Sequence, residues 1–393
     1  MSKTKKTSVD DRPIDWTEAA GKRQAAMLRD LEELVSIESP SDDKAAIDRA
    51  SALIAGWLQT LGGKVRWHRQ KHFGDVLEAR FGPKTQRTAA KPLLLLGHLD
   101  TVWPVGTLAA MPFRVEQGRA FGPGVYDMKA GVVMAVHALG MLQEAGAVHA
   151  PVIVLLNSEE EVGSPCSRAI TERIARECSA VFVLEPAQGA EGAYKTARKG
   201  VGQYTIRVQG VAAHSGVDFE KGHSAILDLA RLLEKVSQFT DLKTGLTVNA
   251  GIVHGGTRVN VVAAEAHAEI DVRIARTRDA ARVERLFRSL RANDRECTVK
   301  ITGGINRPPM ERSRGTVQLF RQAQRLAAEM GFALQEASTG GGSDGNFTAA
   351  IGIPTLDGMG AVGEGAHATH ENILLKALAL RTALLAAMIA NCR

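Results

Sequence analysis

The stretch LLLLGHLD at residues 93–100 decides the fold, because an apolar run of strand length passes directly into a histidine and an aspartate. Two later stretches share this design: VIVLLNSEEE at residues 152–161 and AVFVLEP at residues 180–186. Short continuous apolar runs are typical of strands that are covered on both faces of a sheet. We therefore predict three buried strands, each ending in residues that can bind a metal ion.

Helical patterns surround these strands. We predict helices over residues 24–37, 44–62, 129–145 and 167–177. Strands that alternate with helices indicate an α/β fold with a mostly parallel sheet covered on both faces. In open α/β sheets, ligands bind at the carboxyl ends of the strands, so we expect the three polar strand ends to converge there.

The pattern changes near residue 200. We predict strands at 203–209, 247–254, 264–274 and 298–301, with helices at 224–237 and 279–291. The order β-α-β-β-α-β is that of a ferredoxin-like unit. Helices and short apolar runs return from about residue 313. We expect a discontinuous larger domain, residues 1–199 and 313–393, with a smaller domain, residues 200–312, inserted into it.

Composition excludes several classes of protein. The chain has 393 residues and a net charge of +6, but aromatic residues make up only 5%, which disfavours nucleic-acid binding. We find no apolar segment on the scale of a membrane span and no apolar core of a secretory signal near the N-terminus. None of the four cysteines forms a C-x-x-C pair, so we expect inert thiols in a cytoplasmic protein.

Two further segments can contribute to a metal site. Asp127 lies where a glycine-rich loop enters a helix, and HATHE at residues 367–371 lies near the C-terminus. One carboxylate between two ions, with one histidine and one further carboxylate on each, gives a ligand set that suits zinc. Taken singly, each segment has an ordinary explanation, such as a helix cap for Asp127. Together they favour a dinuclear metal site.

These segments resemble one family. GHLDTV (97–102), GPGVYDMKAG (122–131), NSEEEVGS (157–164), LEPA (184–187) and HATHE (367–371) are similar, in the same order, to the metal motifs of the dizinc metallopeptidases. That family includes glutamate carboxypeptidase, acetylornithine deacetylase and succinyl-diaminopimelate desuccinylase. The resemblance implies a zinc-peptidase-like catalytic domain and is nearest to the glutamate carboxypeptidase group.

The resemblance also implies a role for each matching residue. Two zinc ions per chain, replaceable by Co²⁺ or Mn²⁺, would be bound by His98 and Glu185 on one side and by Glu161 and His367 on the other, with Asp127 bridging them. Glu160 would be the general base. Asp100 would accept the second N–H of the His98 ring and so fix its tautomer.

Two positions have rivals nearby. Three glutamates stand in a row, and the family places base and ligand just before a short residue and a glycine, here Gly163; this selects Glu160 and Glu161 and leaves Glu159. His370 competes with His367, but the family's ligand is followed four residues later by an acid, and Glu371 selects His367.

The smaller domain is expected to contact the substrate. His214, in AAHSG, resembles a family histidine that reaches the neighbouring subunit's active site, which implies a homodimer joined through the inserted domain. Asn260, Arg273 and Arg307 match positions that contact substrate, and an arginine fork suits a planar carboxylate. The glycine-rich loop at residues 340–344 resembles one that lies beside the metals.

We expect a dizinc hydrolase that cleaves a C-terminal peptide bond or an N-acyl amide next to a free carboxylate, as glutamate carboxypeptidase does. The first alternative is a biosynthetic deacylase of the acetylornithine or succinyl-diaminopimelate type. A second is a catalytically inactive metal- or ligand-binding relative, although no predicted ligand or base is missing from this sequence.

Overall fold

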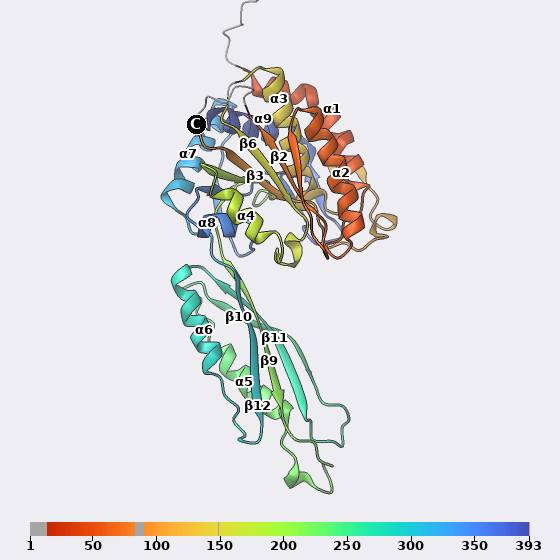
Figure 1. Cartoon of the computed structure of the whole chain (residues 1–393), viewed down its shortest axis with the longest axis vertical. Coiled ribbons are helices and arrows are strands. Elements are labelled where there is room, and N and C mark those ends of the chain that lie inside the picture. Colours follow the sequence, from red (N-terminus) through yellow and green to blue (C-terminus); the bar gives the residue numbers. More distant parts are fainter. Residues whose placement is uncertain (1–13, 83–89, 148, 393) are drawn as a thin grey trace, which may run out of the picture.

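The computed structural model describes residues 14–82, 90–147 and 149–392, which form two bodies (Figure 1). The larger body holds residues 14–198 and 308–392, and the smaller body holds residues 200–307. The larger body is a mixed α/β structure, as the sequence predicts.

The larger body is built on a six-stranded sheet. In spatial order its strands are β1 (Lys64–His68), β2 (Val76–Phe81), β6 (Val152–Asn157), β3 (Leu93–His98), β7 (Ala180–Val183) and β14 (Thr355–Leu356). The strands from β6 to β14 are parallel to one another, whereas β1 and β2 are antiparallel additions at one edge. The expected parallel core is therefore extended into a mixed sheet.

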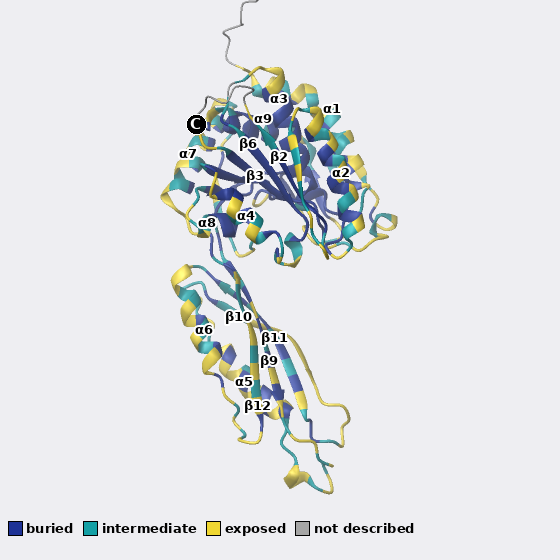
Figure 2. Cartoon of the chain, in the orientation of Figure 1, coloured by how far each residue is buried: buried dark blue, intermediate teal, exposed yellow. Residues whose placement is uncertain are grey.

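Helices cover both faces of this sheet. They are α1 (Trp16–Val35), α2 (Lys44–Thr60), α3 (Ala130–Glu144), α4 (Arg168–Ala175), α7 (Arg314–Glu329), α8 (Gly345–Ala350) and α9 (Leu375–Asn391). Successive residues of β3 belong to two different apolar cores: Leu93 and Leu95 pack with α1, α3 and α9, while Leu94 and Leu96 pack with α4. The central strands are consequently buried throughout (Figure 2).

Helix α3 requires a correction to the expectation about membrane spans. Residues Val125–Glu144 are long and apolar enough to cross a membrane by length and composition alone. In the structure, 94% of the most apolar window is buried, because α1, α9 and the sheet surround the helix. The apolar surface that a membrane would cover is covered here by protein.

The smaller body is one antiparallel sheet with two helices on one face. In spatial order its strands are β10 (Thr247–Gly255), β11 (Glu265–Ile274), β9 (Gly200–Gln209) and β12 (Thr298–Arg307), and the helices are α5 (Ala225–Ser237) and α6 (Ala280–Ser289). Burial alternates along β9 and β11, since every second side chain packs against the helices. The other face of the sheet turns away from α5 and α6.

Short elements complete the chain. A parallel pair joins β8 (Tyr194–Arg198) to β13 (Glu336–Thr339), and a small antiparallel sheet holds β4 (Arg114–Glu116), β5 (Arg119–Phe121), β16 (Asn372–Leu374) and β15 (Gly363–Glu364). Helical turns lie at Thr107–Ala109, Val125–Lys129, Glu160–Val162, Phe219–Lys221 and Thr277–Asp279. The first helix starts at Trp16, earlier than expected, because the Asp15 side chain caps it by accepting from the N–H of Glu18.

Candidate active site

The polar ends of three neighbouring strands meet at one edge of the large sheet. His98 is the last residue of β3 and pairs with Asn157, the last residue of β6. The turn that carries Glu160 and Glu161 follows β6, and Glu185 follows β7 by two residues. Because β6, β3 and β7 are parallel neighbours, their carboxyl ends lie side by side, as expected for a ligand site in an α/β sheet.

Asp127 lies between two histidines. Its Oδ1 atom is 3.3 Å from Nε2 of His98, and its Oδ2 atom is 3.5 Å from Nε2 of His367. On the outer sides, Oε1 of Glu185 is 3.5 Å from Nε2 of His98, and both carboxylate oxygens of Glu161 are 3.1 Å from Nε2 of His367. The five predicted ligands thus lie in one cluster, with the single aspartate in the middle.

This cluster fits metal ions. Nε2 of His98 and Oδ1 of Asp127 are buried and have no hydrogen-bond partner among the described residues. Ligand atoms of His98, Asp127 and Glu161 lie within 4.8 Å of one another, as do those of His98, Glu160 and Glu185. Imidazole nitrogens mixed with carboxylate oxygens are ligands that zinc accepts. The ligand atoms of each group therefore lie close enough together to bind one ion. The second group also contains Glu160, which the sequence predicts to be the general base.

The carboxylates of the cluster lie close together and are largely buried, so positive charge is required to keep them ionised. Burial, together with the neighbouring Asp127 carboxylate, raises the pKa of Glu161 to about 7. Hydrogen bonds to Asp127 and Glu161 raise the pKa of His367 to about 10. A cation bound at the cluster would favour the ionised carboxylates and the neutral histidines, which are the forms that bind metals.

Asp100 holds the strand ends together. Its carboxylate accepts from the backbone N–H of Glu160 at 3.1 Å and of Glu161 at 3.0 Å, and from Oγ of Ser41 at 2.7 Å. Nδ1 of His98 is 3.0 Å from the backbone oxygen of Asp100 and 3.3 Å from its Oδ1. The same aspartate thereby orients the histidine and the two glutamates.

Glu371 has a function that the sequence did not reveal. Its carboxylate accepts from the backbone N–H groups of Gly124, Tyr126 and Asp127 at 2.9–3.0 Å, and from Nε1 of Trp103 at 2.9 Å. The loop that carries Asp127 is thus fixed by a buried acid. The sequence offered one indication of this role. The backbone N–H groups of the loop that carries Asp127 needed acceptors, and Glu371 is an acid close to the predicted ligand His367.

The structure distinguishes the predicted site residues from the neighbouring alternatives, Glu159 and His370. Glu159 is buried away from the cluster and accepts from Oγ of Ser158 and from the N–H groups of Cys166 and Ser167. The exposed His370 has no ion pair with the cluster among the described residues, whereas His367 does. The structure therefore places Glu160, Glu161 and His367 together.

The glycine-rich loop near residue 340 contains the sequence GGSDG at residues 341–345, which has the G-x-S-x-G form found around serine nucleophiles. Ser343 is fully buried, and its hydroxyl donates to Oδ2 of Asp357 at 2.6 Å. No histidine pairs with this hydroxyl among the described residues. Ser343 is therefore a structural group.

A cavity of about 640 Å³ opens beside the cluster, between the two bodies. Its wall includes Glu160, Glu161 and His367 from the larger body and Arg273 from the helix-free face of the smaller body's sheet. Nε of Arg273 donates to Asp271, and Nη1 donates to the backbone oxygen of Gly340. The cavity joins the candidate metal cluster to one predicted substrate contact.

The other predicted substrate contacts lie differently. Arg307 lines the cavity, but its guanidinium contacts Glu160, Asp344 and Ser164. His214 and Asn260 are exposed on the smaller body and do not line this cavity. Within one chain, the structure does not bring these two residues to the metal cluster.

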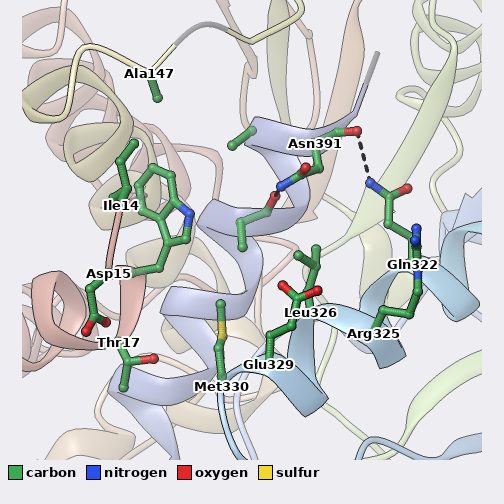
Figure 3. Close-up of a pocket in the computed structure, with 13 residues that line it drawn as sticks. Ile14, Asp15, Thr17, Ala147, Gln322, Arg325, Leu326, Glu329, Met330 and Asn391 are labelled. Carbon is green, nitrogen blue, oxygen red and sulfur yellow. Dashed lines mark hydrogen bonds between the residues drawn. The ribbon is translucent and has the colours of Figure 1, made fainter. Parts of the chain in front are cut away.

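A larger hollow, of about 940 Å³, lies elsewhere in the larger body, where the start of α1 meets α7 and α9 (Figure 3). Apolar side chains and polar groups such as Gln322 and Asn391 line it. None of the predicted site residues reaches it. Size alone therefore does not mark the reaction centre, and the smaller cavity holds the chemically relevant groups.

The chain resembles known proteins over most of its length. The family model described as "Peptidase family M20/M25/M40" matches residues 94–391. Carboxypeptidase G2 of Pseudomonas sp. (strain RS-16) is 32% identical over 354 residues, which cover 89% of this chain and 85% of that protein.

Two solved structures show the same fold. Aminopeptidase PepT of Bacillus cereus superposes with a TM-score of 0.78 at 23% identity, over 93% of this chain and 98% of that one. A protein of Bacillus subtilis described as a dinuclear metal-binding peptidase superposes with a TM-score of 0.69 at 16% identity, over 95% of this chain and 98% of that one.

Proposed function

Because the chain belongs to peptidase family M20/M25/M40 and is a metal-dependent hydrolase, we propose that it cleaves a C-terminal peptide bond or an N-acyl amide next to a free carboxylate, with two zinc ions per chain. The observation that carries this proposal is the position of Asp127, which offers one oxygen to His98 and the other to His367. The similarity to carboxypeptidase G2 favours a carboxypeptidase over a biosynthetic deacylase.

The predicted ligands divide into two sets around Asp127. His98 and Glu185 would hold one ion, and Glu161 and His367 the other. Bound zinc supplies Lewis-acid polarisation of the scissile carbonyl and lowers the pKa of a coordinated water toward neutrality. Asp100 orients this set, because its carboxylate contacts His98 and the turn that carries Glu160 and Glu161.

Glu160 is the general base in this proposal. It lines the cavity at the edge of the ligand cluster. Its carboxylate takes a proton from the water that attacks the carbonyl carbon. As the C–N bond breaks, the same group passes that proton to the leaving nitrogen, so acid and base roles alternate on one side chain.

Arg273 is the proposed contact for the substrate carboxylate. Arg273 lines the cavity, and among the described residues its Nη2 atom has no hydrogen-bond partner, whereas Nε donates to Asp271 and Nη1 to the backbone oxygen of Gly340. A hydrogen bond from an arginine nitrogen to a carboxylate is charge-assisted and therefore strong. Arg307 was predicted to do the same, but its contacts with Glu160 and Asp344 favour a different role.

The test is hydrolysis of a small substrate panel by protein of known zinc content. The panel holds folate and peptides ending in glutamate, N-acetylornithine and N-succinyl-diaminopimelate, each with zinc-replete, chelated and zinc-restored protein. We expect about two zinc ions per chain and chelator-sensitive cleavage of the carboxypeptidase substrates. Cleavage of an N-acyl substrate alone would select the deacylase, and absence of zinc affinity would refute the proposal.

We also propose that two chains form a homodimer through the smaller body. Strand β10 is an uncovered edge of its sheet, and the neighbouring apolar side chains of Ile226, Leu227, Ile252 and Val253 are 43%, 57%, 45% and 53% exposed. Exposed apolar groups beside an open strand edge are typical of an interface. A dimer would also give His214 a site to act on, because it does not line its own chain's cavity.

The dimer and the role of His214 can be tested together. Light scattering should give twice the chain mass, and Leu227→Glu with Val253→Glu should give a monomer. Mixing inactive Glu160→Gln chains with inactive His214→Ala chains should restore activity if His214 acts across the interface, since one mixed site has both groups intact. A wild-type monomer, or mixing without recovery, would overturn the corresponding claim.

A further inference from the structure

Two connectors join the bodies, and they lie side by side. One runs from Arg198 into β9, and the other leaves β12 at Arg307 and reaches Met310. Arg198 and Met310 exchange backbone hydrogen bonds of 2.9 and 3.0 Å. A Cβ atom on Gly200 would lie 2.8 Å from the backbone oxygen of Arg307, so only glycine permits this approach. The junction is therefore a tightly packed double strand.

Each connector carries a buried arginine that reaches a carboxylate of the reaction centre. Nη2 of Arg198 is 3.2 Å from Oε2 of Glu185, whose other oxygen faces His98. Nη2 of Arg307 is 2.9 Å from Oε1 of Glu160. The two arginines are only 4% and 5% exposed. One contacts a predicted zinc ligand and the other contacts the predicted base.

A buried aspartate holds each guanidinium. Asp357 accepts from Nε of Arg198 at 2.9 Å and from Nη2 at 2.6 Å, and Asp344 accepts from Nη1 of Arg307. Asp357 binds two nitrogens of Arg198, and because the guanidinium is planar and rigid, this contact fixes the direction of Nη2 toward Glu185. Arg307 is held at Nη1 by Asp344 and at Nη2 by Oγ of Ser164, so these two partners together direct its Nη2 toward Glu160.

The glycine-rich loop at residues 340–344 and the helix that follows it contact both connectors. The backbone oxygens of Gly341 and Gly342 accept from Nη1 of Arg198, at 3.3 and 3.0 Å. Asn346, fully buried at the start of α8, donates from Nδ2 to the backbone oxygens of Lys199 and Pro308, one on each connector. The glycine-rich loop therefore ties the junction of the bodies to the reaction centre.

From these contacts we infer that Arg198 and Arg307 are positioning residues: Arg198 fixes Glu185 in its ligand orientation, and Arg307 fixes Glu160 beside the cavity. The inference rests on the proposed function. Because both arginines sit on the connectors, the orientation of the smaller body is coupled to the two carboxylates. A shift of either connector would move an arginine and the carboxylate that it holds.

The two arginines should affect different measurements. Arg198→Met should weaken retention of one of the two zinc ions by about 10- to 100-fold, which is typical of groups that orient a metal ligand. Arg307→Met should keep both ions but lower kcat about tenfold or more, because a general base contributes roughly 10²–10⁴. Its KM should stay within about twofold, since a positioning residue does not touch the substrate.

Arg381→Met is the matched control. Arg381 is 3% exposed and donates to the backbone oxygens of Gly192 and Gly358, but it touches no carboxylate of the reaction centre. Arg198→Lys is the second variant in case Arg198→Met does not fold. It keeps the charge and loses the fork, so its zinc retention should also fall.

Zinc retention of Arg198→Lys equal to that of Arg381→Met would overturn the role of Arg198. An increase in the KM of Arg307→Met at unchanged kcat would overturn the role of Arg307 and make it a substrate contact. Failure of the proposed function is separate, because wild-type protein would then lack zinc or turnover before any variant is made.

Discussion

Nε2 of His98 lies 3.3 Å from Oδ1 of Asp127, and among the described residues neither buried atom has a hydrogen-bond partner. Buried polar atoms without partners cost free energy, which a cation between them would offset. We therefore expect chelation to abolish hydrolysis and to lower the melting temperature, because bound metal stabilises only the folded chain. Zinc should restore both quantities. Full activity in protein shown to be metal-free would contradict this assignment.

Substitution of the predicted base separates metal binding from chemistry. Glu160→Gln should retain the zinc content of the wild type and lose about 10²- to 10⁴-fold in kcat, the usual contribution of a general base. Metal analysis and steady-state kinetics on the same sample make the comparison. Near-normal turnover by the zinc-replete variant would exclude Glu160 from proton transfer.

The neighbouring glutamate should affect stability instead. Both carboxylate oxygens of Glu159 accept hydrogen bonds, from Ser158 on one side and from Cys166 and Ser167 on the other. Glu159→Gln keeps only one acceptor, so one set of donors loses its partner, at a cost of about 1–3 kcal/mol. Chemical denaturation measures this loss. A large fall in kcat without a loss of stability would show that the two glutamates had been assigned in the wrong order.

Glu371 should control the Asp127 loop. Glu371→Gln replaces one acceptor oxygen by an NH₂ group that faces the N–H donors of that loop. We expect zinc affinity to fall about 10- to 100-fold, as for other groups that orient ligands. Competition with a chelator of known affinity provides the measurement, and an unchanged zinc affinity would refute the role.

A histidine remote from the cluster should contribute to the pH dependence of stability. Burial lowers the pKa of His137, which outweighs its hydrogen bond to Asp30. The unfolded chain therefore binds a proton at higher pH than the folded chain does, and stability falls as the pH drops below about 6.5. His137→Gln should remove this pH-dependent contribution to stability, so thermal melts at about pH 7.5 and about pH 5.5 should differ less in the variant than in the wild type. Equal differences would show that His137 does not contribute.

The larger features were predictable from local sequence. Apolar runs that end in acids or histidine predicted β3, β6 and β7, and the parallel pairing of these strands places their carboxyl ends side by side. Strands β1 and β2 escaped prediction because residues such as Lys64, Arg66 and Glu78 interrupt any simple apolar pattern. Their position at the antiparallel edge of the sheet allows this polarity.

The network that supports the site was not predictable. Arg198 and Asp357 are 159 residues apart in the sequence, and Arg307 and Asp344 belong to different elements. Neither pair has a local pattern, because the pairing arises only when the connectors pack against the glycine-rich loop. The contacts of His214 and Asn260 could not be predicted either, because they depend on which protein surface packs against the smaller body.

The adjacency of Gly200 and Arg307 also bears on how such a chain can diversify. A segment whose two ends lie side by side can be lengthened, exchanged or removed with little disturbance to the fold that hosts it. All five predicted ligands and Glu160 lie outside residues 201–306, and so do both junction arginines. Recombination at this point would graft a new substrate-facing wall onto an unaltered catalytic core.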